Sequence, residues 1–274
     1  MITEAEFIII DREVKEAVSN ALNKLRSINI NTYALFLADG EYIAEYEGSS
    51  VIGSPYVIDY AMDKYRDASR PAFLANLLNT FYSFPEGSPS VDTEYKIHVE
   101  LMTYSHAWEA RQFLKSLYRL AHLINGEEYA WDVVLPETKR SKFIIEEIKT
   151  PLKHQGSLFN VIDKGYNSSL RNAFAHSDYH FDQLNNSEVI YLDNYKEKNK
   201  AWAIKEITYN DWTKRFLYTV LLSYYLLVLS HEHRSQIIEK TGTDEFHIKV
   251  PSKKNTFDFV WIKYYAKGNR FRFR

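Results

Sequence analysis

The 274-residue sequence contains no cysteine, and this absence excludes several kinds of site at once. Disulfides, cysteine-ligated zinc, iron–sulfur clusters and a cysteine nucleophile all need a thiol. Long apolar runs are also missing, because the longest, residues 216–230, is shorter than the roughly 20 residues of a membrane-spanning helix. The N-terminus has no basic segment or cleavage site of a signal peptide. We therefore expect a cytoplasmic protein that does not enter a membrane.

An excess of charge of one sign is missing as well. The 34 Lys and Arg and 36 Asp and Glu leave a formal net charge of -2, so a nucleic-acid surface would have to be a local patch. Aromatic residues, in contrast, are plentiful, with 21 Tyr and 16 Phe. They are enough for a packed core and leave rings for interfaces and for stacking on bases.

One stretch, residues 168–179, begins in a predicted helix and carries polar groups that core packing does not need. Asn172 and His176 are four residues apart and share a helix face, and Arg171 lies about 100° round from Asn172. Ser177 and Asp178 favour a turn, and residues 179–192 are typical of a strand. We therefore expect His176 near the end of a helix, where its side chain has room.

The pattern Arg171-Asn172-x-x-x-His176, with apolar residues before it and a short strand pair after it, resembles the signature of HEPN domains. These are helical bundles, many of them metal-independent ribonucleases of toxin–antitoxin and antiviral systems. The family pattern is an arginine, four to six residues and a histidine, usually with a polar residue after the arginine. The resemblance covers roughly the C-terminal two thirds, with no evident match before about Val91. It implies a homodimer in which two motifs share one cleft.

Cleavage of RNA without a metal needs a base for the 2′-OH proton, an acid for the leaving 5′-oxygen and positive charge beside the transition state. Histidine can transfer protons near its unperturbed pKa of about 6.5, and the arginine fork can hold non-bridging oxygens. The resemblance therefore predicts His176 as general acid/base, Arg171 as transition-state clamp and Asn172 as orienting group. The products would carry 2′,3′-cyclic phosphates, DNA would not be cut, and no cofactor or metal is expected. Expected partners are RNA, a second copy of the chain and a cognate antitoxin or regulatory protein.

Two other interpretations stay open. One is a catalytically inactive HEPN-like module that binds RNA, a nucleotide or a protein. The other is an unrelated helical interaction protein in which the Arg-His pair only holds the following hairpin. Weaker candidates for substrate binding are Tyr179, His180, Lys214 and Arg215. We do not predict a metal site at His231-Glu232-His233, because residues two apart point away from each other on a helix.

The predicted fold is mainly α: an antiparallel HEPN-like helical bundle with a β-hairpin insertion, a small α+β N-terminal part and a C-terminal strand pair. We place the N-terminal region at residues 1–90, the bundle with the motif at 91–248 and a basic aromatic tail at 249–274. A Pro- and Ser-containing linker at residues 85–90 marks the first boundary.

Within the N-terminal region, a capped helix is predicted over residues 3–28 and a hairpin over 32–46, with Asp39-Gly40 as its turn. Helices follow at about 54–65 and 72–84. In the bundle we expect helices at 94–124, 138–148, 157–175 and 211 to about 240. Strand-like pieces lie between residues 179 and 206, with Asn185-Asn186 as a turn.

The tail alternates aromatic residues with Lys and Arg, which permits two interpretations. It could bind single-stranded nucleic acid, which needs cations and stacking surfaces. The favoured alternative is that its aromatic rings pack inward on a sheet and its Lys and Arg face water.

Overall fold

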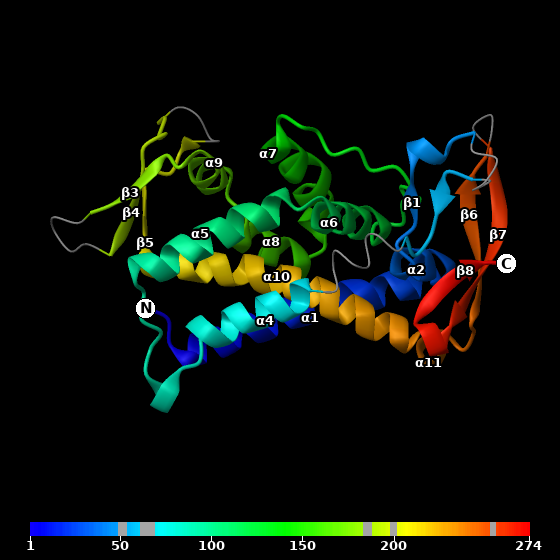
Figure 1. Cartoon of the computed structure of the whole chain (residues 1–274), viewed down its shortest axis with the longest axis horizontal. Helices are drawn as coiled ribbons and strands as arrows, with labels where there is room; N and C mark the ends of the chain where they lie inside the picture. The colour runs from blue at the N-terminus through cyan, green and yellow to red at the C-terminus, as the bar shows by residue number, and fades with distance from the viewer. Residues whose placement is uncertain (49–53, 61–68, 183–187, 198–201, 253–255) are drawn as a thin grey trace.

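The longest helix, α10 (Tyr209–Ser235), runs along the long axis of the molecule, and the other long helices pack around it (Figure 1). The structure is a computed structural model and describes residues 1–48, 54–60, 69–182, 188–197, 202–252 and 256–274. The helices with the most extensive contacts to α10 are α1 (Glu4–Ile28), α5 (Glu94–Glu109) and α8 (Ser157–Gly165). Their apolar residues join those of the rest of the chain in one hydrophobic core. The fold is therefore mainly helical.

The remaining helices complete this arrangement. They are α2 (Ile30–Leu37), α4 (Arg70–Phe81), α6 (Arg111–Leu123), α7 (Arg140–Phe143), α9 (Ser168–His176) and α11 (Ile237–Thr241). The π-helical segment η3 (Ile144–Lys149) continues α7, and the 3₁₀ turns are η1 (Ala44–Tyr46), η2 (Pro85–Gly87), η4 (Pro151–His154) and η6 (Ala266–Gly268). In the described part of the chain, no helix combines the length and apolar character needed to cross a membrane.

Small antiparallel sheets complete the structure. The pair β1 (Glu41–Tyr42) and β2 (Tyr56–Val57) is the smallest. One three-stranded sheet contains β3 (Tyr179–Phe181), β4 (Val189–Leu192) and β5 (Glu206–Thr208), and the other contains β6 (Glu245–Pro251), β7 (Phe257–Tyr265) and β8 (Arg270–Phe273). These two sheets lie at opposite ends of the molecule (Figure 1).

Local sequence signals explain the two longest helices. Thr3 and Glu6 form the predicted capping box at the start of α1, and Thr208 caps α10 by accepting a hydrogen bond from the backbone N–H of Asp211. One stripe of α1 is buried, whereas α10 is buried on most of its circumference. A helix that is apolar on all sides belongs inside the protein, and α10 is therefore the centre of the core.

A buried polar cluster joins three of these helices. The carboxylate of Glu100 on α5 accepts hydrogen bonds from Trp212 Nε1 of α10 at 2.9 Å and from the hydroxyl of Tyr82, next to α4, at 2.5 Å. Lys96 Nζ lies 3.6 Å from Glu100 Oε1 and 2.6 Å from Asp92 Oδ1. Burial raises the pKa of Glu100 to about 7, against the opposing charge of Lys96.

The predicted hairpin at residues 32–46 is wrong. The first predicted strand lies in helix α2, which Asn29 caps by accepting hydrogen bonds from the N–H groups of Asn31 and Thr32. Its apolar run is buried on every side, and such a run carries no period that separates a strand from a helix. The second predicted strand supplies β1, which pairs with β2 instead.

Other predicted elements differ mainly at their breaks. The helix at 94–124 divides at Ala110 into α5 and α6, and the helix at 157–175 divides before α9, where Asn167 caps a new helix. In the helix expected at 54–65, residues 56–57 form β2, while residues 61–65 and the turn at Asn185-Asn186 lie outside the described residues. The hairpin insertion and the C-terminal strand pair are each three-stranded sheets.

We expect Glu100→Gln to flatten the dependence of stability on pH. A carboxyl pKa raised to about 7 means that the folded state binds the proton more tightly than the unfolded state, so this group stabilises the fold at low pH. That contribution is lost as the pH rises from about 4.5 through 7. At about 1.4 kcal/mol per pKa unit, it amounts to roughly 3 kcal/mol.

Urea unfolding at pH 5 and pH 8 measures this difference, with the exposed Glu137→Gln as the matched control. If the free energy of unfolding of Glu100→Gln changes between the two pH values as much as that of the wild type, the assignment to Glu100 is wrong.

Candidate functional site

Helix α9 positions the three motif residues. It begins at Asn167, whose side chain accepts hydrogen bonds from the N–H groups of Ser169 and Leu170. It ends directly after His176, because Ser177 adopts a left-handed conformation with φ 58°. The N–H of Asp178 then returns to the carbonyl of Ala173 at 2.8 Å, which is the hydrogen bond of a Schellman C-cap. The prediction that His176 lies at a helix end is confirmed.

The guanidinium of Arg171 is held inside the protomer. Its Nη1 donates to Asn172 Oδ1 at 2.9 Å, and its Nη2 pairs with Glu109 Oε1 at the end of α5. Only 15% of the Arg171 side chain is exposed, and Nε is buried without a hydrogen-bond acceptor in the described residues. Burial lowers the pKa of Arg171, but an arginine remains protonated at neutral pH.

A second arginine reaches the same carboxylate. Arg140, at the start of α7, places Nη1 3.7 Å from Glu109 Oε2 and donates to the Glu109 backbone carbonyl at 3.4 Å. Burial, followed by the charge of Arg111, lowers the pKa of Arg140. Arg140 and Arg171 therefore both pair with Glu109, and Arg111 lies close enough for its charge to act on Arg140. We call Glu109, Arg111, Arg140 and Arg171 the arginine cluster. It is a locally positive region in a chain with a net charge of -2.

Asn172 and His176 have different surroundings. Asn172 is buried, and its Oδ1 accepts from Arg171 and, at 3.5 Å, from Ser141 Oγ. It therefore orients the arginine rather than the imidazole. His176 is exposed and makes no hydrogen bond or ion pair with any residue that the structure describes. The imidazole is thus free to meet a partner from outside the protomer.

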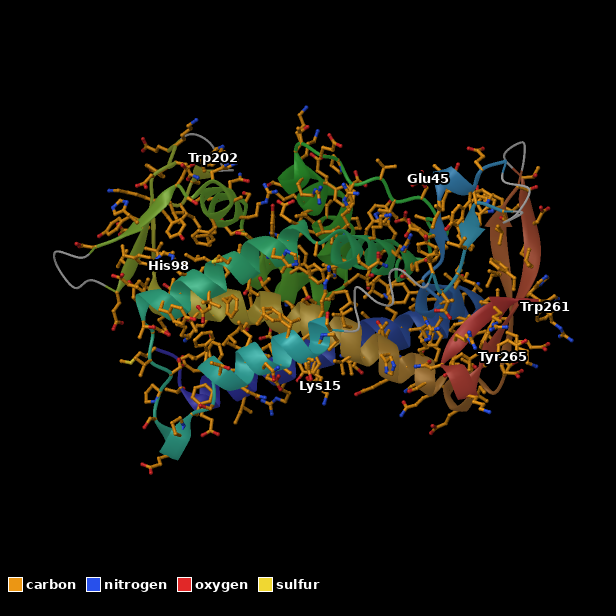
Figure 2. All side chains as sticks on the ribbon, in the orientation of Figure 1. Lys15, Glu45, His98, Trp202, Trp261 and Tyr265 are labelled. Carbon is orange, nitrogen blue, oxygen red and sulfur yellow. The ribbon has the colours of Figure 1, made fainter. Side chains whose placement is uncertain are left out.

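The structure does not bring Tyr179 and His180 into the arginine cluster. The hydroxyl of Tyr179 lies 3.0 Å from His98 Nδ1 on α5, and its ring packs edge-on against Phe174. The position of His98 beside this sheet is visible in Figure 2. His180 Nδ1 lies 2.7 Å from Asp193 Oδ1. Both side chains thus hold β3 in place.

Lys214 and Arg215 also have structural partners. Lys214 Nζ lies 2.9 Å from Glu6 Oε1, so it joins the N-terminal part of α10 to the N-terminal part of α1. Arg215 Nη1 donates to the carbonyls of Asp163 and Tyr166 at 3.4 and 3.3 Å, at the C-terminus of α8. Within the described part of the chain, neither side chain forms a hydrogen bond or an ion pair with His176.

The sequence did not reveal Glu109, Arg111 and Arg140 as members of the site. Glu109 and Arg111 lie within the single helix predicted over residues 94–124, whereas the structure breaks this helix at Ala110. Arg140 is 31 residues from Glu109 and has no spacing relation to it. A signal for the pair does not exist in local sequence, because the contact depends on how α5, α7 and α9 pack.

No metal-binding group appears among the residues that the structure describes. His233 is buried, its Nδ1 lies 2.9 Å from the hydroxyl of Tyr33, and burial lowers its pKa to about 4. His231 Nε2 lies 2.9 Å from Nδ2 of Asn269, the residue directly before β8. The two histidines therefore have separate partners.

No protein-family model matches this chain, and comparisons with curated proteins and with solved structures give no significant match.

We expect Arg171 and Glu109 to be energetically coupled. In a double-mutant cycle with Arg171→Ala and Glu109→Ala, the half-buried pair should give an interaction energy of about 1 kcal/mol or more in the free energy of unfolding. The exposed pair Lys142–Glu146, 3.6 Å apart, is the matched control and should give about 0.3–0.5 kcal/mol. Equal coupling energies for the two pairs would show that Glu109 does not hold Arg171.

Proposed function

We propose that this protein is a metal-independent endoribonuclease with a HEPN-like bundle, acting as a homodimer in the cytoplasm, in a toxin or antiviral role. The observation that carries the proposal is the exposed His176 at the end of a helix whose preceding turn holds Arg171 in the arginine cluster. Helix α9 thus carries a proton-transfer group at its end and a fixed positive charge in its preceding turn. These are the two components that phosphodiester cleavage needs in the absence of a metal.

The chemistry divides between two copies of the chain. One His176 takes the proton of the ribose 2′-OH, and the 2′-oxygen attacks the phosphorus. Arg171 stabilises the charge on the non-bridging oxygens, and Asn172 keeps the guanidinium oriented through its 2.9 Å hydrogen bond. The His176 of the other copy protonates the leaving 5′-oxygen. The products are a 2′,3′-cyclic phosphate and a 5′-hydroxyl.

A single protomer does not suffice for this reaction. On an ideal helix, His176 is about 7.5 Å further along the axis than Arg171 and roughly 140° round it. The two side chains of one α9 therefore point to different sides. A second copy supplies both the missing histidine and a facing surface.

The pairing of Arg171 with Glu109 favours a second candidate function, a HEPN-like module that binds RNA, a nucleotide or a protein without cutting. In the protomer, Nη2 is occupied by the carboxylate, and a phosphate has to displace Glu109 to reach it. Cleavage is possible if RNA or the dimer partner makes that exchange favourable, and binding alone results if it does not.

We expect His176→Ala to abolish cleavage of a labelled RNA pool in EDTA. Removal of a proton-transfer group lowers the rate by roughly 100-fold or more. The exposed His154→Ala is the matched control and should cut as the wild type does. Matched DNA should stay intact, because it has no 2′-OH. If wild type and His176→Ala cut RNA equally in EDTA, or if DNA is cut too, the proposed mechanism is wrong.

We expect mixed dimers to show that each active site needs a histidine from both copies of the chain. When wild type and His176→Ala are mixed at constant total protein and allowed to exchange subunits, activity should follow the square of the wild-type fraction, because both histidines are needed. Cleavage rates across the mixing series measure this dependence. A linear decrease would show that each protomer cuts alone.

A further inference from the structure

The C-terminal sheet turns its aromatic residues to water. Along β7, every second residue points outward, and the aromatic side chains among them are 46% exposed at Phe257, 62% at Phe259, 47% at Trp261 and 44% at Tyr265. We call these four residues the outer aromatic face. The inner side of the sheet is aliphatic and aromatic and is buried: Phe246, Ile248, Ile262, Tyr264 and Phe271. The interpretation that the tail aromatics pack inward therefore holds for Tyr264 and Phe271 and is wrong for the outer aromatic face.

Cations lie on the same face. The strand register places Arg272 opposite Lys263 and Arg270 opposite Tyr265, so both arginines share the side of the outer aromatic face. The guanidinium of Arg272 lies 5.8 Å from the Tyr265 ring centre. Neither arginine forms an ion pair with any residue in the described ranges. Their charge is therefore uncompensated.

Glu245 and Glu128, beside the outer aromatic face, are paired with cations, and Asp258 of β7 alternates to the opposite side of the sheet. Glu245 pairs with Lys263 at 3.2 Å and with Arg274 at 2.6 Å, and Glu128 pairs with Lys249 at 2.7 Å. Lys249 Nζ also lies 4.0 Å above the Phe257 ring centre. The outer aromatic face is therefore a surface of aromatic rings surrounded by a net positive charge.

The central ring is fixed from the neighbouring strand. His247 of β6 stacks on Trp261 with ring centres 4.6 Å apart and an angle of 17° between the planes. Figure 2 shows Trp261 and Tyr265 on the outside of the sheet. At the other end of the face, a cavity of about 280 Å³ opens beside Phe257 and Phe259, lined by the polar side chains of Asn29, Asn31 and Thr32.

We propose that the outer aromatic face binds single-stranded RNA, with bases stacked on Phe259 and Trp261 and phosphates on Arg270 and Arg272. Residues two apart on a strand are roughly 6.8 Å apart, so each ring can stack on its own base. Stacking and uncompensated arginines together are what single strands require. A protein partner is less well matched, because no aliphatic side chain stands among the outward residues of β7 between Phe257 and Tyr265. The choice of RNA rests on the proposed function.

The sheet lies at the opposite end of the molecule from β3, which directly follows His176 (Figure 1). The face therefore holds RNA away from the site of cleavage, and the two activities can be tested separately.

The experiment uses the full chain with His176→Ala, so that RNA stays intact. Binding of a labelled 12-nucleotide oligo(U) RNA is followed by fluorescence anisotropy. Phe259→Ala with Trp261→Ala should weaken binding at least about ten-fold. The matched control is Phe73→Ala with Tyr95→Ala, which removes exposed aromatic rings from α4 and α5 and should leave the affinity unchanged.

A second variant tests the charges without touching the rings. Arg270→Gln with Arg272→Gln should reduce the slope of log affinity against log salt concentration by about 1.4, as expected for two lost phosphate contacts to a single strand. A duplex of the same length should bind at least ten-fold more weakly than the single strand, because its bases are not free to stack on the rings. Circular dichroism checks that each variant is folded.

Unchanged affinity in both double variants, or equal binding of the duplex, overturns the proposal. If the aromatic variant lowers the mass in sedimentation and leaves RNA affinity unchanged, the face joins copies of the chain, and the proposal also fails. The ribonuclease proposal is judged separately. If the variants of the outer aromatic face lose RNA binding and the wild type does not cleave RNA, the binding proposal is supported and the ribonuclease proposal is wrong. If cleavage depends on His176 and the face variants bind RNA as the wild type does, the ribonuclease proposal is supported and the binding proposal is wrong.

Discussion

The hydrogen bonds of Glu100 inside the core are the constraint on which the positions of the helices depend. A buried carboxylate is costly unless it is satisfied, and here one group receives hydrogen bonds from Trp212 and Tyr82 and faces Lys96. This fixes α5 against α10. Because Glu109 is the last residue of α5 and α9 packs on that helix, the same anchor determines where the carboxylate meets Arg171.

Helix breaks build the arginine cluster. The break at Ala110 ends α5 at Glu109, and Asn167 starts α9 at a new angle so that Arg171 can approach. Tyr104 supports the second break, because its hydroxyl accepts a hydrogen bond from the Asn167 N–H at 3.0 Å. The cluster is therefore the product of three segments that are distant in the sequence. Its electrostatics are local, and the overall charge of the chain gives no indication of them.

Capping residues and long periodic stripes made part of the fold predictable from sequence. Thr3 marks the start of α1 correctly, and the end of α9 at His176 follows from its turn residues. The apolar run of α2 was predicted as a strand because a run that is buried on all sides shows no helical period. Glu109 and Arg140 could not be found, since their meeting is a tertiary contact. The side of the sheet on which the β7 rings lie could not be predicted either. Alternation assigns side chains to two faces but does not show which face packs against the core.

Helix α10 also sets a distance. It begins directly after β5, in the sheet that follows α9, and α11 leads from its far end into β6. Its 27 residues correspond to about 40 Å of rigid, fully hydrogen-bonded backbone. Under the two proposals above, an RNA chain held on the C-terminal sheet and cut at the α9 end of the same protomer would have to bridge that length. The protein would then act as a ruler, and fragments too short to reach from one end of α10 to the other would escape.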